Sequence, residues 1–528
     1  MDNKKTGMNP ILPGFYPDPS ICRVNDDYYL VTSTFAYFPG VPIFHSRDLV
    51  HWNQIGNILE RKEQLPLVNA ETSEGIFAPT LRYHDGTFYM ITTNVTPTND
   101  INNFIVTATD PAGPWSDPYP LDSAGIDPSL FFDDDGKCYY CGTQNRREGS
   151  RYFGDNEIYI QELDLNTMKL VGESYPAWHG ALRGVEWPEG PHIYKKDGYY
   201  YIFLPAGGVA TGWQVVLRSK NIYGPYESRT VLAQGNTPVN GPHQGGWVDT
   251  PTGEDWFMHF QDVGAYGRVV HLQPMKWIDG WPVIGTDKDN DGCGEPVLTY
   301  RKPDVGGTYP TCTPQESDEF DGYTLSPQWQ WHANINDKWA YYAGDRSMVR
   351  LYSHPVTEDY KNLWDVPNLL LQKTPADNFT ATMKLTFSPN PKYKGERTGL
   401  VVMGMDYAGL IMENTEQGLM LSQVTCRKAD KGTAEKANGS ISLNNPTVYL
   451  RVKFSADSEK VKKTNDLLVL CQFSYSLDGK KFRPLGETFQ AREGKWIGAK
   501  VGMFCTRPAI RANDGGWADV DWFRITKK

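Results

Sequence analysis

Residues 183–205, RGVEWPEGPHIYKKDGYYYIFLP, decide the fold of the first half of the chain. The stretch contains a turn that carries an acid, a strand of β-branched and aromatic residues, a Lys-Lys-Asp-Gly turn and a second apolar strand. It therefore predicts a β-hairpin with a carboxylate in front of its first strand.

The same pattern occurs four more times. The copies are DPSICRVNDDYYLVTS from Asp18, APTLRYHDGTFYMITT from Ala78, DPSLFFDDDGKCYYCG from Asp127 and a looser GPHQGGWVDTPTGEDWFMHF from Gly241. One proline is common to all five copies, at Pro19, Pro79, Pro128, Pro191 and Pro242. All-β units repeated about every fifty to sixty residues cannot bury their faces alone, and they pack radially instead. We therefore expect a five-bladed β-propeller.

Three of the copies place an acid at or next to the start of the repeat, namely Asp18, Asp127 and Glu189. Glu189 is preferred to Glu186 because it stands two residues before the proline of the repeat. Equivalent positions of a radial repeat converge on one axis. The spacing therefore predicts that the three carboxylates share one central funnel.

Three clustered carboxylates suit the hydrolysis of a glycoside. The reaction needs an acid to protonate the departing oxygen and a carboxylate that generates or acts as the nucleophile. A third carboxylate raises the pKa of the acid by like-charge repulsion and keeps it protonated. The alternative for each residue alone is a turn cap that accepts a backbone N–H, but three acids at equivalent positions favour a catalytic site.

The composition indicates an all-β chain with room for two domains of unequal size, since its 528 residues include 50 Gly and 37 Pro. The 16 Trp, 30 Tyr and 22 Phe can supply flat faces for sugar rings, although most of them are expected in the core. The net charge of −11 argues against a nucleic acid or an anionic membrane as the partner.

The eight cysteines show no even spacing, so a disulfide scaffold is not expected. Cys138 and Cys141 form a lone CxxC inside a tyrosine-rich strand, where zinc is not expected either. No run of eighteen apolar residues is present, and MDNKKTGMNP lacks the apolar stretch of a signal peptide. We expect a cytoplasmic protein, or a periplasmic or secreted one if a leader was removed before Met1.

The sequence pattern changes after a Pro- and Gly-rich linker from Tyr300 to Glu316. Stretches such as SDEFDGYTLSPQWQWHAN and ADVDWFRI alternate apolar with polar residues and no longer follow the repeat, which predicts a jelly-roll-like β-sandwich. The expected domains are a propeller over 1–305 and a sandwich over 306–528. The segment DKDNDG at 287–292 imitates a calcium loop, but its twelfth position is Leu298, so an Asp-rich turn is expected.

Four motifs together carry a family resemblance. FYPDPS with Asp18, GIFAPTLRYHDG, GIDPSLFFDDDG with Asp127 and EGPHIYKKDGYYY with Glu189 resemble glycoside hydrolase family 43, whose catalytic domain is a five-bladed propeller. The second domain resembles the C-terminal β-sandwich of the β-xylosidase-like members. The resemblance implies an inverting mechanism in which Asp18 is the general base, Glu189 the general acid and Asp127 the residue that tunes and orients Glu189. It also implies a base–acid separation of roughly 6.5 to 9.5 Å, which leaves room for a water.

The resemblance further implies a set of residues around the sugar. Phe35, Phe77, Ala78 and Arg268 match positions that hold the terminal sugar in relatives, and Phe77 stands where many relatives have Trp. Phe38 on the same aromatic turn as Phe35 is a candidate for the pocket wall, with packing between blades one and two as the alternative. Phe504 is a candidate for reaching the pocket from the sandwich, with a core position as the alternative. His243 matches a histidine near the axis that supports a bound calcium or its water shell, while the chemistry itself requires no cofactor.

The predicted function is therefore an exo-acting inverting glycosidase that releases terminal α-L-arabinofuranose, β-D-xylose or both. Its expected substrates are fragments of xylan, arabinan, arabinoxylan or xyloglucan. Two alternatives stay open at this stage: a sugar-binding propeller without catalysis, and an endo-arabinanase with an open groove.

Overall fold

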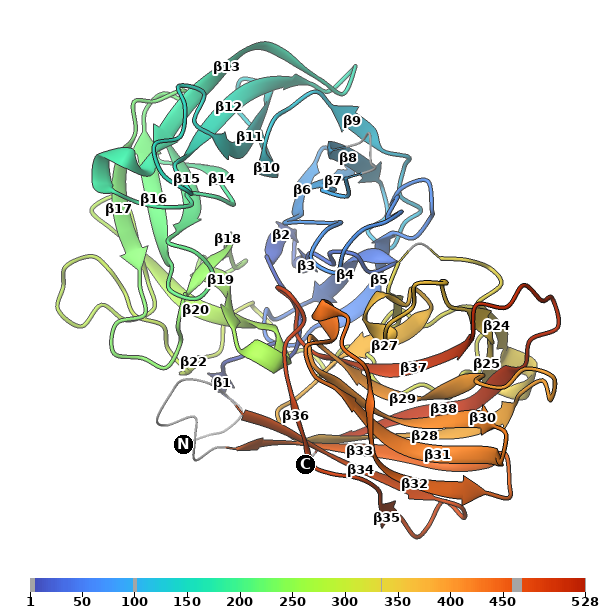
Figure 1. The fold of residues 1–528 in the computed structure, drawn as a ribbon. Coiled ribbons are helices and arrows are strands. Elements are labelled where there is room, and N and C mark those ends of the chain that lie inside the picture. The colour runs from blue at the N-terminus through green and yellow to red at the C-terminus, as the bar shows by residue number, and fades with distance from the viewer. Residues whose placement is uncertain (1–4, 98–101, 334, 458–467, 528) are drawn as a thin grey trace.

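The computed structural model describes residues 5–97, 102–333, 335–457 and 468–527. Part of the N-terminal stretch on which the leader expectation depends, residues 1–4, lies outside these ranges. The described residues form a ring of five small sheets beside a pair of large sheets (Figure 1). Their helices are 3₁₀ turns at Gly180–Arg183, Gly264–Tyr266, Gly344–Arg346, Leu363–Asp365 and Ala429–Lys431. No helix in these ranges has the length and apolar character needed to cross a membrane.

Each of the five repeats forms one four-stranded antiparallel blade, which confirms the predicted propeller. The innermost strands are β2 (Ser20–Val24), β6 (Thr80–His84), β10 (Ile126–Phe132), β14 (His192–Lys196) and β18 (His243–Asp249). The outer strands follow in chain order: β3 (Asp27–Val31), β4 (Gly40–Ser46) and β5 (Asn53–Leu59) in blade one; β7 (Thr87–Thr93), β8 (Asn103–Ala108) and β9 (Tyr119–Leu121) in blade two; β11 (Cys138–Asn145), β12 (Asn156–Asp164) and β13 (Lys169–His179) in blade three; β15 (Tyr199–Ala206), β16 (Trp213–Ser219) and β17 (Glu227–Leu232) in blade four; β19 (Asp255–Asp262), β20 (Arg268–Ile278) and β21 (Trp281–Ile284) in blade five.

The hairpin at 183–205 forms for the reason its sequence suggests. Lys196 pairs with Tyr199, so only Asp197 and Gly198 make the turn, with φ of 49° and 76°. A two-residue turn with two positive φ angles matches the twist of the flanking strands, and Asp-Gly is suited to it. The inner strand of blade four is therefore anchored by local chemistry.

The ring closes through the start of the chain. Strand β1 (Thr6–Met8) pairs with β22 (Thr299–Arg301), and Ile11 and Leu12 exchange backbone hydrogen bonds with Val270 of blade five. Tyr300 therefore belongs to a strand, and the expected linker begins after Arg301. Between the blades lie separate apolar cores. Cys138 and Cys141 face different cores, so the CxxC cannot bind one metal ion.

The second domain is a sandwich of two eight-stranded sheets, as predicted. The first sheet contains β23 (Gln330–Trp331), β27 (Leu369–Lys373), β37 (Lys500–Arg507), β29 (Arg397–Met403), β30 (Tyr407–Thr415), β31 (Gly418–Cys426) and β32 (Lys436–Leu443), with β26 (His354–Pro355) beside β37. The second contains β24 (Ala340–Ala343), β25 (Met348–Tyr352), β38 (Trp517–Lys527), β28 (Phe379–Ser388), β33 (Thr447–Asp457), β34 (Leu468–Ser476) and β35 (Arg483–Pro484), with β36 (Phe489–Ala491) beside β34.

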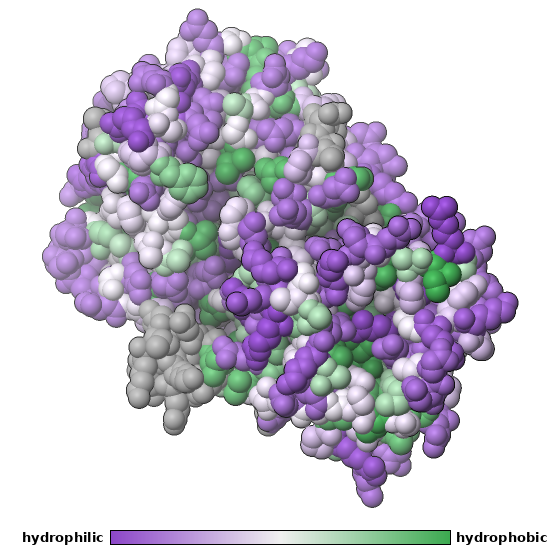
Figure 2. Space-filling view, in the orientation of Figure 1, coloured by the Kyte–Doolittle hydropathy of each residue, from purple (hydrophilic) through white to green (hydrophobic). Residues whose placement is uncertain are grey.

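The sandwich packs against blades one and five of the propeller, beside β4, β5 and β20 (Figure 1). Phe15 and Tyr37 of the propeller share a buried apolar cluster with Leu369 and Val401 of the first sheet. Backbone hydrogen bonds from Phe38 to Trp331 (2.9 Å) and from Ala499 to Ala265 (2.7 Å) join the domains. The outer face in view is mostly hydrophilic, with small separate apolar patches (Figure 2). A shared apolar cluster and backbone hydrogen bonds therefore hold the sandwich against the propeller.

Candidate active site

All five inner strands begin at the same end of the axis, and in four blades the residue before the repeat's proline is left-handed. Asp18, Asp127, Gly190 and Gly241 stand immediately before the repeat's proline with φ of 53°, 54°, 50° and 52°. Glycine adopts this conformation freely, whereas for an L-residue it is strained, with Asp among the more tolerant types. Two blades thus retain an aspartate where a glycine would be less strained, which is typical of functional sites.

Asp18 is buried at the start of blade one and is held by two groups. The Ser33 hydroxyl donates to Asp18 Oδ2 at 2.5 Å, and Arg268 Nη1 lies 3.4 Å from Asp18 Oδ1. Arg268 is itself buried at the start of β20. The carboxylate is therefore fixed in orientation, with one cation beside it.

Asp127 and Glu189 are linked through the backbone. The N–H of Gly190 donates to Asp127 Oδ2 at 3.0 Å, and Gly190 follows Glu189 directly. Glu189 is half-buried, and its backbone N–H donates to the carbonyl of Pro205. Within the described parts of the chain its carboxyl has no hydrogen-bond or ion-pair partner. Asp127 is thus placed to orient the segment that carries Glu189, whose carboxyl is left available.

The pKa values of the three acids are shifted by burial and by one another. Burial, followed by the charges of Asp127 and Asp18, raises the pKa of Glu189 to about 8. Burial and the charge of Asp18 raise the pKa of Asp127 to about 7. Burial also raises the pKa of Asp18, but Arg268 and the Ser33 hydroxyl act in the opposite direction. The three predicted acids are therefore close enough to shift one another's pKa. The raised pKa keeps Glu189 protonated at neutral pH, and Asp18 is the acid with a cation beside it.

An aromatic wall stands next to this centre. The Phe35 and Phe77 rings lie 5.6 Å apart, and the Arg268 guanidinium is 5.8 Å from the Phe35 ring. Ala78 is buried at the start of blade two, directly after Phe77. Four of the residues expected at the terminal sugar are thus contiguous in space or in sequence.

The sandwich adds Trp496, which sequence reasoning missed. Its ring lies 5.9 Å from Phe77 and 6.5 Å from Phe35, and the residue is 53% exposed. A cavity of about 220 Å³ lies beside it, lined also by Arg268. The sequence offered one indication of this role: the tryptophan stands in the polar, glycine-containing stretch REGKWIGAK. A large aromatic residue outside an apolar strand pattern is not expected in a core.

Two predicted sugar-binding residues are corrected by the structure. Phe504 in β37 is 0% exposed, because it lies in the apolar cluster between the first sandwich sheet and the propeller. Phe38 packs with Val31 and Leu81 in the core between blades one and two. Both rings are covered by protein and belong to cores. Phe35 is as buried as Phe38, at 3% exposed, so the half-buried Phe77 and the exposed Trp496 present the accessible part of the wall. The sandwich reaches the wall through Trp496 instead.

His243 is fully buried at the start of β18. Its Nδ1 donates to the carbonyl of Gly241 at 2.8 Å, and burial lowers its pKa to about 4, so the ring is neutral. Nε2 has no partner among the described residues. Calcium prefers several oxygen ligands, and no group of three candidate ligands in the described ranges includes His243. The unpartnered Nε2 could bond a water, and a structural calcium near His243 stays a prediction.

The acidic turn at 287–292 behaves as an Asp-rich turn. The carboxylates of Asp287 and Asp291 accept backbone N–H groups from Asn290, Gly292 and Cys293. One oxygen from each of Asp287, Asp289 and Asp291 lies within 4.8 Å of the others, a grouping that could hold a cation, and Asp289 and Asp291 are exposed to solvent. The local hydrogen bonds are those of an Asp-rich turn, and the expectation that no calcium binds there stays a prediction.

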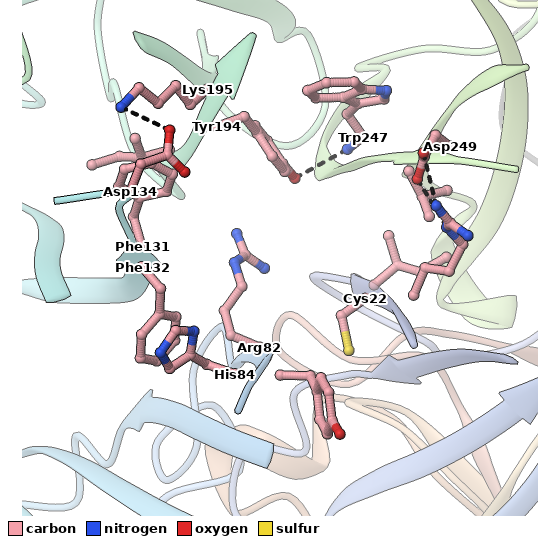
Figure 3. A pocket seen from close by; sticks show the side chains of 15 residues that line it. Cys22, Arg82, His84, Phe131, Phe132, Asp134, Tyr194, Lys195, Trp247 and Asp249 are labelled. Carbon is pink, nitrogen blue, oxygen red and sulfur yellow. Dashed lines mark hydrogen bonds and ion pairs between the residues drawn. The ribbon is translucent and has the colours of Figure 1, made fainter. Parts of the chain in front are cut away.

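The opposite mouth of the axis has a cavity of about 530 Å³ (Figure 3). It contains none of the three acids. Arg23 makes two hydrogen bonds of 2.9 Å to Asp249, and Lys195 lies 2.6 Å from Asp133 and 3.2 Å from Asp134. Its carboxylates are thus neutralised by cations, unlike Glu189.

A five-bladed propeller with a protonated carboxyl and a cation-paired carboxylate in one buried centre defines an acid–base hydrolase of glycosides. Residues 8–282 match the model of glycosyl hydrolases family 43, and residues 317–526 match the beta xylosidase C-terminal concanavalin A-like domain. The chain belongs to glycosyl hydrolases family 43. It is a glycoside hydrolase, and its partner is a glycan.

Several relatives carry names that describe related activities. A xylosidase/arabinosidase of Butyrivibrio fibrisolvens is 53% identical over 52% of this chain and 56% of its own length. A putative beta-xylosidase of Xylanibacter ruminicola is 35% identical over 93% of this chain and 85% of its own length. Among solved structures, a xylan beta-1,4-xylosidase from Bacillus halodurans has a TM-score of 0.85 at 30% identity, covering 99% of this chain and 100% of its own.

Proposed function

We propose that this protein is an exo-acting inverting glycosidase that removes a terminal pentose from hemicellulose oligosaccharides. Asp18 is the general base that activates a water. Glu189 is the general acid that protonates the departing oxygen, and Asp127 keeps Glu189 protonated and oriented.

One observation carries the proposal: burial raises the pKa of both Asp18 and Glu189, but the charge of Arg268 and the Ser33 hydroxyl act in the opposite direction at Asp18. Glu189 has no cation beside it and has a raised pKa, whereas Asp18 has Arg268 at 3.4 Å. Inversion needs one acid and one base at the same pH, so this division of roles matches the reaction.

The proposed terminal sugars are α-L-arabinofuranose and β-D-xylose. The relatives' names support both, since they include a non-reducing end alpha-L-arabinofuranosidase of Bacteroides ovatus that is 37% identical over 80% of this chain and 79% of its own length. The solved structure of the Bacteroides ovatus xyloglucan PUL GH43B has a TM-score of 0.83 at 32% identity, covering 99% of this chain and 100% of its own. We propose fragments of xylan, arabinoxylan, arabinan or xyloglucan as the source.

Exo action is supported by the position of Trp496. Its ring stands against Phe35 and Phe77 from the sandwich side, next to blades one and five. A wall on this side leaves little room for a chain that continues beyond the terminal sugar.

The test is hydrolysis of 4-nitrophenyl α-L-arabinofuranoside and β-D-xyloside, with the first-formed anomer followed by NMR. We expect turnover of at least one glycoside and release of the inverted anomer. Sugar binding without turnover would favour a binding propeller, and oligosaccharide products from linear arabinan would favour an endo-arabinanase. A retained anomer would exclude the water-activating role of Asp18.

A further inference from the structure

The opposite mouth of the propeller axis, the far mouth, contains an arginine without a counter-ion. Arg82 of β6 is half-buried, and its guanidinium points into the cavity of about 530 Å³ at this mouth (Figure 3). Its hydrogen bonds go to the carbonyl of Leu81 at 2.9 Å and to Nδ1 of His192 at 2.9 Å. Among the described residues it forms no ion pair with a carboxylate. Two of its five N–H donors are thus engaged, and three remain for other groups.

Neither hydrogen-bond partner of Arg82 carries a negative charge. The carbonyl of Leu81 is neutral. Burial, followed by the charge of Arg82, lowers the pKa of His192 well below its usual range, so this imidazole is neutral too. Because a guanidinium only donates, Nδ1 of His192 is the acceptor of the bond. The charge of Arg82 is therefore not matched by the groups that hold its side chain in place.

The carboxylates of the far mouth are already paired with other cations. Asp249 accepts two hydrogen bonds of 2.9 Å from Arg23. Asp133 and Asp134 lie 2.6 Å and 3.2 Å from the ammonium group of Lys195. These pairs leave no carboxylate for Arg82, and at the edge of the cavity they present both donors and acceptors.

The groups beside Arg82 are neutral as well. The Tyr194 ring lies 5.5 Å from the guanidinium, and its hydroxyl accepts the N–H of Trp247 at 3.1 Å. Within the described ranges this hydroxyl donates to no other group. Burial raises the pKa of Cys22 to about 12 although Arg82 acts against it, so Cys22 stays a thiol. The cavity thus offers a cation and a free hydroxyl donor at one place, which is what an anion needs.

The size and walls of the cavity suit more than a small inorganic ion. Its volume of about 530 Å³ falls in the range of pockets for small organic molecules. Trp247 and Phe131 line it, together with the stacked rings of His84 and Phe132, whose centroids are 4.3 Å apart with an interplanar angle of 5°. Aromatic faces pack against the C–H face of a sugar ring, and the ion pairs at the edge suit its hydroxyl groups.

We propose that the far mouth is a second binding site, separate from the three acids, for a sugar acid of the size of a hexuronate. The carboxylate binds Arg82 and the Tyr194 hydroxyl, the ring packs against the aromatic wall, and the ring hydroxyls meet the ion pairs. A free sugar acid and a glycan that ends in one share this chemistry. The site does not depend on the proposed hydrolysis, because it contains none of the residues assigned to that reaction.

The test is calorimetric titration of the full chain with D-glucuronate, its methyl β-glycoside, D-glucose and acetate. We expect both uronates to bind at least about ten-fold more tightly than glucose or acetate, because only they combine the carboxylate with the ring. Tighter binding of the methyl glycoside identifies a glycan end as the source, and tighter binding of the free acid identifies a monosaccharide. Absence of uronate binding would overturn the proposal. Acetate binding as tight as uronate binding would show an adventitious anion only and would overturn it too.

Two variants locate the site. Arg82→Gln should weaken the binding of D-glucuronate at least about ten-fold, because a hydrogen-bonded charge pair is lost. Tyr194→Phe keeps the ring and removes the hydroxyl, and it should weaken binding about three-fold. Arg524→Gln is the matched control, since Arg524 is 51% exposed and paired with Glu319 in the sandwich, and it should leave the affinity unchanged.

Circular dichroism establishes that each variant is folded before it is titrated. Unchanged affinity of a folded Arg82→Gln variant would place the probe elsewhere and overturn the site. If that variant does not fold, Tyr194→Phe decides by the same criterion. Every measurement is a binding measurement, so a protein without hydrolytic activity would overturn the proposed function and leave this result standing.

Discussion

The two ends of the five inner strands differ in how they treat charge. At the end where the strands begin, Asp18 and Asp127 adopt left-handed conformations and Glu189 has no partner in the described residues. At the far end, Arg23 is paired with Asp249 and Lys195 with Asp134 (Figure 3). The same strands thus have one end with strained backbone and three acids beside one cation, Arg268, and a second end where each of the two carboxylates just named has its own cation.

This difference separates function from structure in one element. Carboxyl groups that outnumber the cations in a buried centre shift each other's pKa, which favours an acid and a base at one pH. Paired charges at the far mouth are partly exposed, and such pairs contribute about 0 to 1 kcal/mol each. If the comparison is right, substitutions of equal chemistry at the two ends must have unequal effects.

The largest effect is expected from Asp18→Asn. The amide keeps the shape of the side chain but cannot accept the proton of the attacking water, so kcat should fall at least about 10³-fold on every substrate. Steady-state assay with a 4-nitrophenyl pentoside and with an oligosaccharide measures it. A loss on one substrate only would remove Asp18 from the role of base.

Glu189→Gln should have the next largest effect, and it should depend on the leaving group. Natural oligosaccharides need their departing oxygen protonated, so their turnover should fall about 10²- to 10³-fold. A 4-nitrophenolate departs without full protonation, and its release should fall less. Equal losses on the two substrates would contradict the assignment of Glu189 as the acid.

The pH dependence should be bell-shaped, because activity needs Asp18 deprotonated and Glu189 protonated. The alkaline limb of kcat/KM should lie near pH 8, the pKa to which burial and the neighbouring carboxylates raise Glu189. Asp127→Asn removes one of these negative charges, so the pKa of Glu189 should fall and the limb should move to lower pH. A limb that stays in place or moves upward would show that Asp127 does not tune Glu189.

A smaller effect is expected from Trp496→Ala. The ring lies at the edge of the wall and is half exposed, so its loss should raise KM about three- to ten-fold with little change in kcat. Phe504→Leu, within the interdomain core, should leave KM unchanged. A change in KM for Phe504→Leu with none for Trp496→Ala would place Phe504, and not Trp496, at the sugar.

The smallest effect is expected from Asp249→Asn at the far mouth. The substitution weakens the ion pair with Arg23. Because the Asp249 side chain is 49% exposed, the loss should lower the free energy of unfolding by about 1 kcal/mol or less. Activity should stay within about two-fold. A loss of activity as large as that of Asp18→Asn would show that the far mouth also takes part in catalysis, and would contradict the comparison.

The sites that sequence reasoning located and missed differ by a physical cause. Asp18, Asp127 and Glu189 were located because each lies at a fixed offset from a repeated proline, and a repeat converts offset into position around an axis. Trp496 lies in a connection of the sandwich with no repeat, so no offset marks it. Phe38 and Phe504 were misassigned because the same aromatic side chain suits a pocket wall and a core equally well.

The sequence by itself determined the five blades, the sandwich and the identity of the three acids, because hairpin turns, alternation and repeat spacing are local properties that a chain displays in order. Only the tertiary structure decided which groups meet. Arg268 approaches Asp18 across 250 positions, and the raised pKa of Glu189 depends on burial and on carboxylates from two other blades. Distance and dielectric environment arise when the ring closes, and neither is written in any single stretch of the chain.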